Sequence, residues 1–252
     1  MKYINYKIEN GIGFLNFNRP EKYNAFHTEL LLELSDLLQA EDKNDKLKVL
    51  ILSGEGKAFS SGVDLKSLLE LNTVEKARHF ALLLESTSEK IYHFSKPVIA
   101  VINGIALGGG LGYATSADIR VMSNETKIGY PAVKLGAILP ATCTIYLKNL
   151  IGEGRTKDLL LTGRMITAEE ALQMGLISYI QTSENLMNFA IEKAHQIMEA
   201  PDLALAYTKQ TVSYSTRLEI EAAKLYAADN FAFLSQTKEW QKRMNDFANK
   251  KK

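Results

Sequence analysis

The sequence predicts an α/β fold with a helical C-terminal part. Two apolar segments, 47–54 and 96–104, have the length and composition of buried strands, and each leads through a glycine-bearing loop into a helix start. From about residue 141 onward, apolar residues recur at helical spacing. Alternating strands and helices followed by helices alone predict an α/β core over residues 1–190 and a helical region over residues 191–252.

The N-terminal segment predicts a β-hairpin, because residues 3–8 and 12–17 alternate polar and apolar side chains around a glycine turn. Residues 18–26 have the composition of a loop. Residues 28–40 place apolar side chains at helical spacing, so we expect a helix there with Thr28 as its N-cap.

Further elements are expected around and after the two buried strands. The sequence predicts helices over 64–71 and 74–94, then a strand, a glycine loop and a helix within 105–116, and another strand over 117–123. In the second half, three glycines are placed to end helices as C-caps: Gly152, Gly163 and Gly175.

The composition excludes several classes of protein. With 30 basic and 29 acidic residues the net charge is +1, so no global field favours nucleic acid or a membrane surface. No apolar stretch reaches the ~18–20 residues of a membrane span, and the N-terminus lacks the apolar core of a signal peptide. The single cysteine, Cys143, excludes an internal disulfide framework and fits a reducing compartment. These features predict a cytoplasmic protein.

Common nucleotide, metal and hydrolase motifs are missing. The glycine run "GGGLG" does not match a dinucleotide-binding loop, and there is no GxxxxGK[ST] or GxSxG segment. HExxH and CxxC are absent, and the four histidines are dispersed along the chain. We therefore expect no metal site and no separate cofactor.

Two loops share a pattern that suggests a different chemistry. The segments "LILSGEGKAFSSGVDLK" and "AVINGIALGGGLGYA" each contain an apolar strand, a glycine-bearing loop and a helix start. If both loops face one point, each can offer a backbone N–H to a single oxygen, which is the arrangement of an oxyanion hole. The same pattern also fits two tight strand-to-helix turns with only a structural role, so the spacing alone leaves both readings open.

Five segments, in order along nearly the whole chain, resemble the crotonase (enoyl-CoA hydratase/isomerase) superfamily: "NRPEKYNAF", "GKAFSSGVDLKSL", "NGIALGGGLG", "ADIRVMSNETKIGYPAVKLG" and "LTGRMITAEEALQMGLI". The resemblance implies a spiral of ββα units with a C-terminal α-helical region. It also implies self-association as trimers or hexamers, and an acyl-CoA or acyl-carrier thioester as substrate.

Carried over motif by motif, the resemblance implies a site built largely from backbone. The oxyanion donors would be the N–H groups of Val63 and Gly109. Because the implied substrate is an acyl-CoA thioester, CoA would be part of the substrate and not a cofactor. The residues implied to lie against CoA come from the first two segments: Lys22, Tyr23, Ala25, Ser61, Asp64, Leu65 and Lys66.

The sequence departs from the family where catalytic carboxylates are expected. Gly112 stands at the glutamate position after the glycine run, and Ala132 at the glutamate position of an "FGxPE" pattern. Leu139 or Pro140 stands at the position of a third carboxylate found in many isomerases and some dehalogenases. A positioned general acid or base contributes about 10²–10⁴-fold to a rate, so we do not expect standard two-glutamate hydration.

Several side chains are candidates to replace these carboxylates. His79 lies on a helix that borders the acyl pocket in the family and can act as acid or base near neutral pH, although a position on the helix surface is the more common one for such a histidine. Tyr113 directly follows Gly112, and Tyr130 lies two residues before Ala132. Their phenol groups can donate hydrogen bonds, but aromatic side chains more often serve only for packing. Glu70 fits a solvated helix face, and Cys143 fits a small buried residue better than a nucleophile.

These observations predict an enzyme that processes an acyl thioester through an enolate, as a lyase or an isomerase of the enoyl-CoA hydratase/isomerase family. The alternative is a catalytically silent homologue that binds acyl-CoA. The missing carboxylates at Gly112, Ala132 and Pro140 motivate that alternative.

Overall fold

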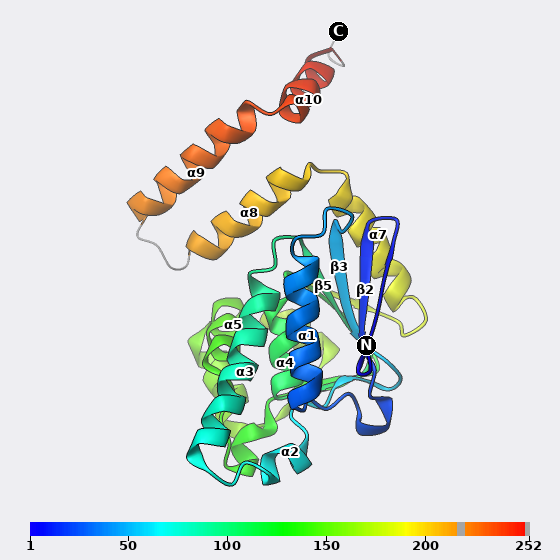
Figure 1. Cartoon of the computed structure of the whole chain (residues 1–252), viewed down its shortest axis with the longest axis vertical. Coiled ribbons are helices and arrows are strands. Elements are labelled where there is room, and N and C mark those ends of the chain that lie inside the picture. The colour runs from blue at the N-terminus through cyan, green and yellow to red at the C-terminus, as the bar shows by residue number, and fades with distance from the viewer. Residues whose placement is uncertain (216–219, 250–252) are drawn as a thin grey trace.

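The chain winds through a repeat of two strands and a helical segment, in a computed structural model that describes residues 1–215 and 220–249 (Figure 1). The strand pairs are β3 (Val49–Gly54) with β4 (Ala58–Ser60), β5 (Val98–Ile102) with β6 (Ile105–Leu107), and β7 (Ile119–Ser123) with β8 (Lys127–Gly129). The helical segments that follow them are α2 (Leu65–Leu69) with α3 (Val74–Tyr92), then α4 (Gly109–Ser116), then a 3-10 turn (Pro131–Leu135) with α5 (Ala141–Thr162). The predicted spiral of ββα units is thereby confirmed.

Each turn of the spiral contributes one strand to each of two sheets. The larger sheet has the order β1-β2-β3-β5-β7-β10, and the smaller sheet has the order β4-β6-β8-β9. The hairpin of β1 (Ile4–Glu9) and β2 (Ile12–Phe17) is antiparallel, whereas β2, β3, β5, β7 and β10 (Tyr179–Gln181) run parallel. In the smaller sheet, β9 (Met165–Thr167) pairs antiparallel with β8. The parallel strands are nearly all apolar because helices cover both faces of the larger sheet.

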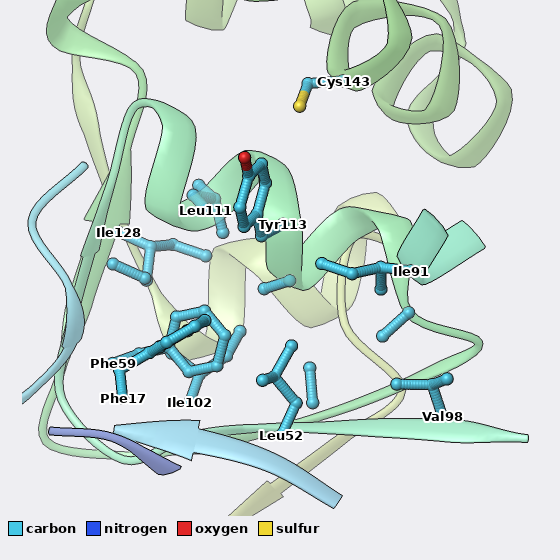
Figure 2. Close-up of a cluster of buried hydrophobic side chains, with 14 of the residues drawn as sticks. Phe17, Leu52, Phe59, Ile91, Val98, Ile102, Leu111, Tyr113, Ile128 and Cys143 are labelled. Atoms are coloured by element: carbon cyan, nitrogen blue, oxygen red, sulfur yellow. The ribbon is translucent and has the colours of Figure 1, made fainter. Parts of the chain in front are cut away.

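Two apolar clusters lie on opposite faces of the larger sheet. On one face, α7 (Leu186–Met198) packs Leu186, Ala190 and Ala194 against alternate side chains of the strands. On the other face lie α1 (Thr28–Glu41), α3 and α4, as Figure 1 shows. Figure 2 shows the interior of this second cluster, where Phe17 and Phe59 lie between the sheet and α4, and Tyr113 points from α4 toward Cys143. This packing fixes the N-terminus of α4, which becomes important for the site.

The C-terminal helices leave this body. After α6 (Ala168–Met174) and α7 comes α8 (Asp202–Ser215), which the ion pair between Lys209 and Asp118 joins to the body. Helices α9 (Ile220–Ser235) and α10 (Lys238–Asn249) extend beyond it, away from the sheets (Figure 1). Helix α7 spans the boundary expected at residue 190 and packs on the larger sheet. Within the described residues, no helix combines the length and apolar character needed to cross a bilayer.

Some local expectations need correction. Helix α1 begins at Thr28, but the N-cap is His27, whose backbone is extended and whose side chain makes no capping hydrogen bond. Gly163 and Gly175 end helices in left-handed conformation, as predicted, whereas Gly152 has φ 79° and ψ 164° and kinks α5 internally. The region after residue 141 is not helical throughout, because it also contributes the short strands β9 and β10.

Candidate functional site

A cavity of about 880 Å³ lies where four segments of the spiral meet. The first loop, the loop and helix after β4, the N-terminal part of α4 and the 131–140 segment each provide part of the wall. Helix α3 closes the remaining side. Because these segments come from successive turns of the spiral, their convergence follows from the topology of the fold.

One end of the cavity is polar. We use the name polar end for the part of the lining that comes from the first loop and from residues 61–66. It includes the exposed Glu21 and every residue that the sequence resemblance assigned to CoA: Lys22, Tyr23, Ala25, Ser61, Asp64, Leu65 and Lys66. The Ser61 N–H donates to the Tyr23 carbonyl at 2.9 Å, so the two segments that supply these residues are joined directly. The exposed Lys22 and Lys66 give this end two cationic side chains, the charge that a phosphate-bearing ligand requires.

The rest of the cavity is apolar. Helix α3 presents Ala77, Phe80, Ala81 and Leu84, and the facing wall is formed by Leu68, Leu71, Leu107, Pro131, Ala132, Leu135, Ala137, Ile138, Leu139 and Pro140. None of these side chains is titratable. The structure therefore places Ala132, Leu139 and Pro140, the altered family positions, at a cavity wall that offers no proton donor or acceptor.

The two glycine-bearing loops meet at the lining of the cavity. Gly62 has φ +90°, and a Cβ added to it would lie 2.7 Å from the Leu107 oxygen and 3.4 Å from the Gly109 nitrogen. Only glycine allows this backbone conformation and this close approach. A Cβ added to Gly109 would lie 3.9 Å from Cγ2 of Val63. The two segments that were expected to carry oxyanion donors are therefore neighbours.

Among the described residues, neither expected donor N–H is used in a backbone hydrogen bond. The groups on either side of Val63 are used: the Phe26 N–H donates to the Gly62 oxygen at 2.7 Å, and the Asp64 N–H donates to the Phe26 oxygen at 2.8 Å. Gly109 is the first residue of α4, where N–H groups have no intrahelical partner. Within residues 1–215 and 220–249, neither the Val63 nor the Gly109 N–H donates to a backbone carbonyl.

Asp64 has structural partners as well as its place at the polar end. Its Oδ2 accepts from Nη1 of Arg19 at 2.5 Å, and its Oδ1 caps α2 by accepting from the Lys66 N–H at 2.8 Å. Burial acts to raise the pKa of the Asp64 carboxyl, but the hydrogen bonds from Arg19 and Lys66 and the guanidinium charge hold that pKa below its usual value. Asp64 is therefore ionised at neutral pH and already paired.

The place beside Gly112 is filled by another side chain. A Cβ added to Gly112 would lie 2.6 Å from Sγ and 3.0 Å from Cβ of Cys143, which is fully buried on α5. The thiol also contacts Oγ of Ser88 at 3.4 Å, and burial raises its pKa to about 11. Cys143 is thus a neutral packing residue, and Gly112 is a close helix-to-helix contact that does not line the cavity.

A carboxylate close to this region is also in use. Glu85 on α3 accepts hydrogen bonds from the N–H groups of Ala141 and Thr142, at 2.6 and 3.0 Å, and from the Thr142 hydroxyl at 2.7 Å. It caps the N-terminus of α5, where a negative charge is favoured by the helix dipole. Its role is therefore to anchor α5 against α3.

The side chains predicted as substitutes do not line the cavity. Tyr113 is fully buried, stacks on Phe26 at 4.7 Å and donates to the Leu84 carbonyl at 3.2 Å. Its hydroxyl points toward Cys143 in Figure 2. Tyr130 is buried as well, and burial raises the pKa of both phenols. His79 is exposed and lines a separate surface hollow together with Glu70.

Two features of the site escape sequence reasoning. Arg19 pairs with Asp64 across 45 residues of sequence, and Cys143 occupies the space beside Gly112. The motif "NRP" does place an arginine before the first cavity segment, but nothing in it indicates the partner. Among the described residues, no three His, Cys, Asp or Glu side chains are grouped so that they could hold a metal ion.

Known proteins resemble this chain along nearly its whole length. A family model described as enoyl-CoA hydratase/isomerase matches residues 7–252. The chain is 32% identical over 245 residues to the short-chain-enoyl-CoA hydratase of Clostridium acetobutylicum, and 33% identical over 245 residues to the crotonyl-CoA hydratase of Syntrophomonas wolfei; in each case 97% of this chain and 94% of the relative are covered. The crystal structure of enoyl-CoA hydratase from Bacillus anthracis matches with a TM-score of 0.94 and 31% identity, covering 99% of this chain and 97% of that one. The chain therefore belongs to the enoyl-CoA hydratase/isomerase family.

Proposed function

We propose that this protein binds an acyl-CoA or acyl-carrier thioester and stabilises its enolate with the N–H groups of Val63 and Gly109. The observation that supports this proposal is that Val63 and Gly109 line one cavity together with polar residues on one side and apolar side chains on the other. A thioester has the same division, with an anionic carrier, a central carbonyl and an apolar acyl chain. The hydratase names of the relatives support the same substrate class.

In this mechanism, backbone N–H groups stabilise the developing negative charge. As negative charge develops on the thioester oxygen, two N–H dipoles that are already oriented stabilise it without reorganisation. Removal of one such donor costs about 2.7–4 kcal/mol in a protease. This stabilisation needs no particular side chain at residues 63 and 109. It is therefore independent of whether glutamates stand at positions 112 and 132.

The apolar end argues for a reaction that needs no carboxylate base. Decarboxylation of a carboxyacyl thioester meets this condition: the C–C bond to the carboxylate breaks, its electron pair forms the enolate, and CO₂ leaves. The enolate carbon then takes a proton from water. An apolar wall favours the step because it solvates the starting carboxylate poorly, whereas the enolate oxygen receives two hydrogen bonds. Isomerisation through the same enolate requires a group that carries the proton between two carbons.

A silent acyl-CoA-binding protein is the second candidate. The observation that favours it is the apolar end itself, where no titratable side chain lines the wall. A positioned acid or base contributes about 10²–10⁴-fold, and its loss slows water addition accordingly. This candidate predicts thioester binding with no turnover of any substrate.

Self-association is part of the proposal. Helices α8, α9 and α10 extend from the body, and they expose large apolar side chains such as Leu225, Phe231 and Phe233. Exposed apolar patches of this kind are typical of interfaces, which supports the trimer or hexamer that the family resemblance implies. Sedimentation measurements on the whole chain test this directly, and a monomer at micromolar concentration would contradict it.

A panel of thioesters separates the two candidates. Crotonyl-, 3-enoyl-, malonyl- and methylglutaconyl-type CoA esters are incubated with the protein, and the products are identified by mass spectrometry. We expect loss of CO₂ from a carboxyacyl ester, and no hydration of crotonyl-CoA at a hydratase-like rate. Binding of all four without any product would favour the silent protein.

Three variants test the absence of a side-chain acid or base. His79→Ala, Tyr113→Phe and Tyr130→Phe should leave the turnover of the active thioester unchanged, because none of these side chains lines the cavity. A large loss of turnover in a variant that remains folded would show that the replaced side chain takes part in the reaction. A bound thioester analogue whose carbonyl misses the Val63 and Gly109 N–H groups would reject the central claim.

A further inference from the structure

We propose that Arg19 is a positioning residue, whose ion pair with Asp64 holds the Val63 N–H in the orientation that polarises the bound carbonyl. This inference rests on the proposed function, since it concerns the same carbonyl. Arg19 does not line the cavity, so it acts through Asp64 and not by touching the ligand.

One nitrogen of Arg19 joins the two segments that form the polar end. Its Nη1 lies 2.5 Å from Oδ2 of Asp64 and donates to the Ala25 carbonyl at 3.1 Å. The Arg19 backbone is fixed in turn, because its N–H donates to Oδ1 of Asn24 at 2.9 Å. Asn24 is fully buried, and its Nδ2 donates to the Ala58 carbonyl at 2.8 Å. The backbone of Arg19 is therefore tied through Asn24 to strand β4.

Burial makes this ion pair different from a surface pair. The side chains of Arg19 and Asp64 are 16% and 13% exposed, whereas those of the Arg164–Asp158 pair are 35% and 43% exposed. A pair that is largely removed from water is screened less by solvent and salt than an exposed one. Loss of Arg19 would leave the Asp64 carboxylate nearly buried without its cationic partner, which is costly. Loss of Asp64 would leave Arg19 only the exposed Glu21, whose Oε1 lies 3.9 Å from Nε of Arg19.

The ion pair acts on the peptide that carries the proposed donor. Asp64 follows Val63 directly, and the hydrogen bonds of Phe26 to Gly62 and Asp64 hold the backbone on either side of Val63. Arg19 adds a third restraint next to Val63, because it holds the carboxylate of Asp64. The same carboxylate also caps α2. Because an oxyanion donor works only when its N–H is aimed at the oxygen, release of this restraint should weaken polarisation more than binding.

The pairing also gives Asp64 a role other than direct contact with CoA. An unpaired carboxylate beside a phosphate-bearing ligand would repel it. Arg19 neutralises this charge, so Asp64 can stand at the polar end without opposing the ligand. The cationic contact is left to Lys22 and Lys66, which are both exposed.

The test measures the carbonyl directly. Butanoyl-CoA labelled with ¹³C at the thioester carbon is bound to the protein, and its carbonyl resonance is recorded by NMR. Hydrogen bonds from two N–H groups draw electron density toward the oxygen and shift the resonance downfield of the free ester. Arg19→Lys and Asp64→Asn are the test variants, because each keeps a polar group near its original place. Asp158→Asn is the matched control at the exposed arginine–aspartate pair.

We expect the bound resonance of Arg19→Lys and Asp64→Asn to move back toward that of the free ester. The dissociation constant of free CoA should change by no more than about threefold, and turnover of the active thioester should fall by about 10–100-fold, as for a misplaced catalytic group. The double variant should be no worse than the single variants, because both remove one interaction. Asp158→Asn should match the wild type in all three measurements.

Contrary results are distinct from failure of the proposed function. A wild-type bound shift in folded Arg19→Lys and Asp64→Asn would overturn the positioning role. Weakened CoA binding with an unchanged carbonyl shift would overturn it too, and would make the pair a CoA-binding element. If the wild-type protein produced no downfield shift at all, the proposed oxyanion hole itself would be rejected.

Discussion

Gly112 on α4 and Cys143 on α5 are in such close contact that no side chain fits between them. A Cβ at position 112 would lie 2.6 Å from the sulfur. The glutamate that the family resemblance implies at this position would have no space here, because Cys143 of the neighbouring helix α5 occupies it. Restoring a longer side chain at 112 requires α5 to give way.

Gly112→Ala should destabilise the protein. Alanine gains about 0.5–1 kcal/mol over glycine within a helix, but overpacking a core typically costs 1–3 kcal/mol. We expect a net loss in the free energy of unfolding, measured by denaturant titration. The double variant Gly112→Ala/Cys143→Ala should recover part of it, because it removes the sulfur but keeps the Cys143 Cβ position 3.0 Å away. Gly154→Ala is the control, because Gly154 is helical and a Cβ there meets nothing within 4 Å, so that variant should be as stable as the wild type or more so.

Two adjacent glycines of the run should behave in opposite ways. A Cβ on Gly109 meets nothing closer than 3.9 Å, whereas a Cβ on Gly110 would lie 2.3 Å from the Ser60 carbonyl oxygen. Gly109→Ala should therefore leave thermal stability unchanged or raised, and Gly110→Ala should lower it by forcing α4 away from β4. Equal stabilities of the two variants would contradict the packing described for this junction.

Cys143 should be inert in the native protein. Burial raises the pKa of its thiol to about 11, so at pH 8 very little thiolate is present and reagent cannot reach it. A maleimide or disulfide reagent should label the chain only after denaturation, at one site by mass spectrometry. Rapid labelling of the folded protein would show that α5 opens readily from α4.

His27 should make the protein less stable in mild acid. Burial and the nearby Arg19 lower the pKa of His27, although Glu29 and Asp64 act to raise it. Between the lowered folded pKa and the unfolded value of 6.5 the unfolded chain binds more protons, so stability falls as the pH drops through this window.

His27→Gln should flatten the dependence of unfolding free energy on pH between about 7 and 5. His195→Gln, at an exposed histidine, is the control and should keep the wild-type profile. A His27→Gln profile that equals the wild type would place the acid sensitivity at another group.

The sequence predicts the fold well because its information is local. The buried strands and the helices of the spiral can be recognised from runs of apolar residues and from spacing alone. The segments that form the cavity can be recognised from motifs whose proposed role uses only backbone groups. A changed side chain within such a motif therefore does not prevent its recognition. The assignment of Val63 and Gly109 as donors rests on the family resemblance of these motifs and stays a prediction.

Contacts between distant residues were not predictable. Tyr113 is next to Gly112 in sequence, but successive helical residues point in different directions, so Tyr113 enters the core instead of the cavity. The pairing of Arg19 with Asp64 joins two loops that only the folded spiral brings together. Glu85 likewise reads as an ordinary helix-surface acid until α5 is seen to begin against it.

The walls of the cavity come from successive turns of one spiral, and this has a consequence for folding. No two turns alone enclose the space, so the site exists only when the spiral is complete from the first loop to the 131–140 segment. Opening of any turn must release the ligand, and a bound ligand must therefore hold every turn closed. At a ligand concentration 100 times its dissociation constant this linkage amounts to about 2.7 kcal/mol, so occupancy of the cavity and resistance of the whole spiral to proteolysis should rise together.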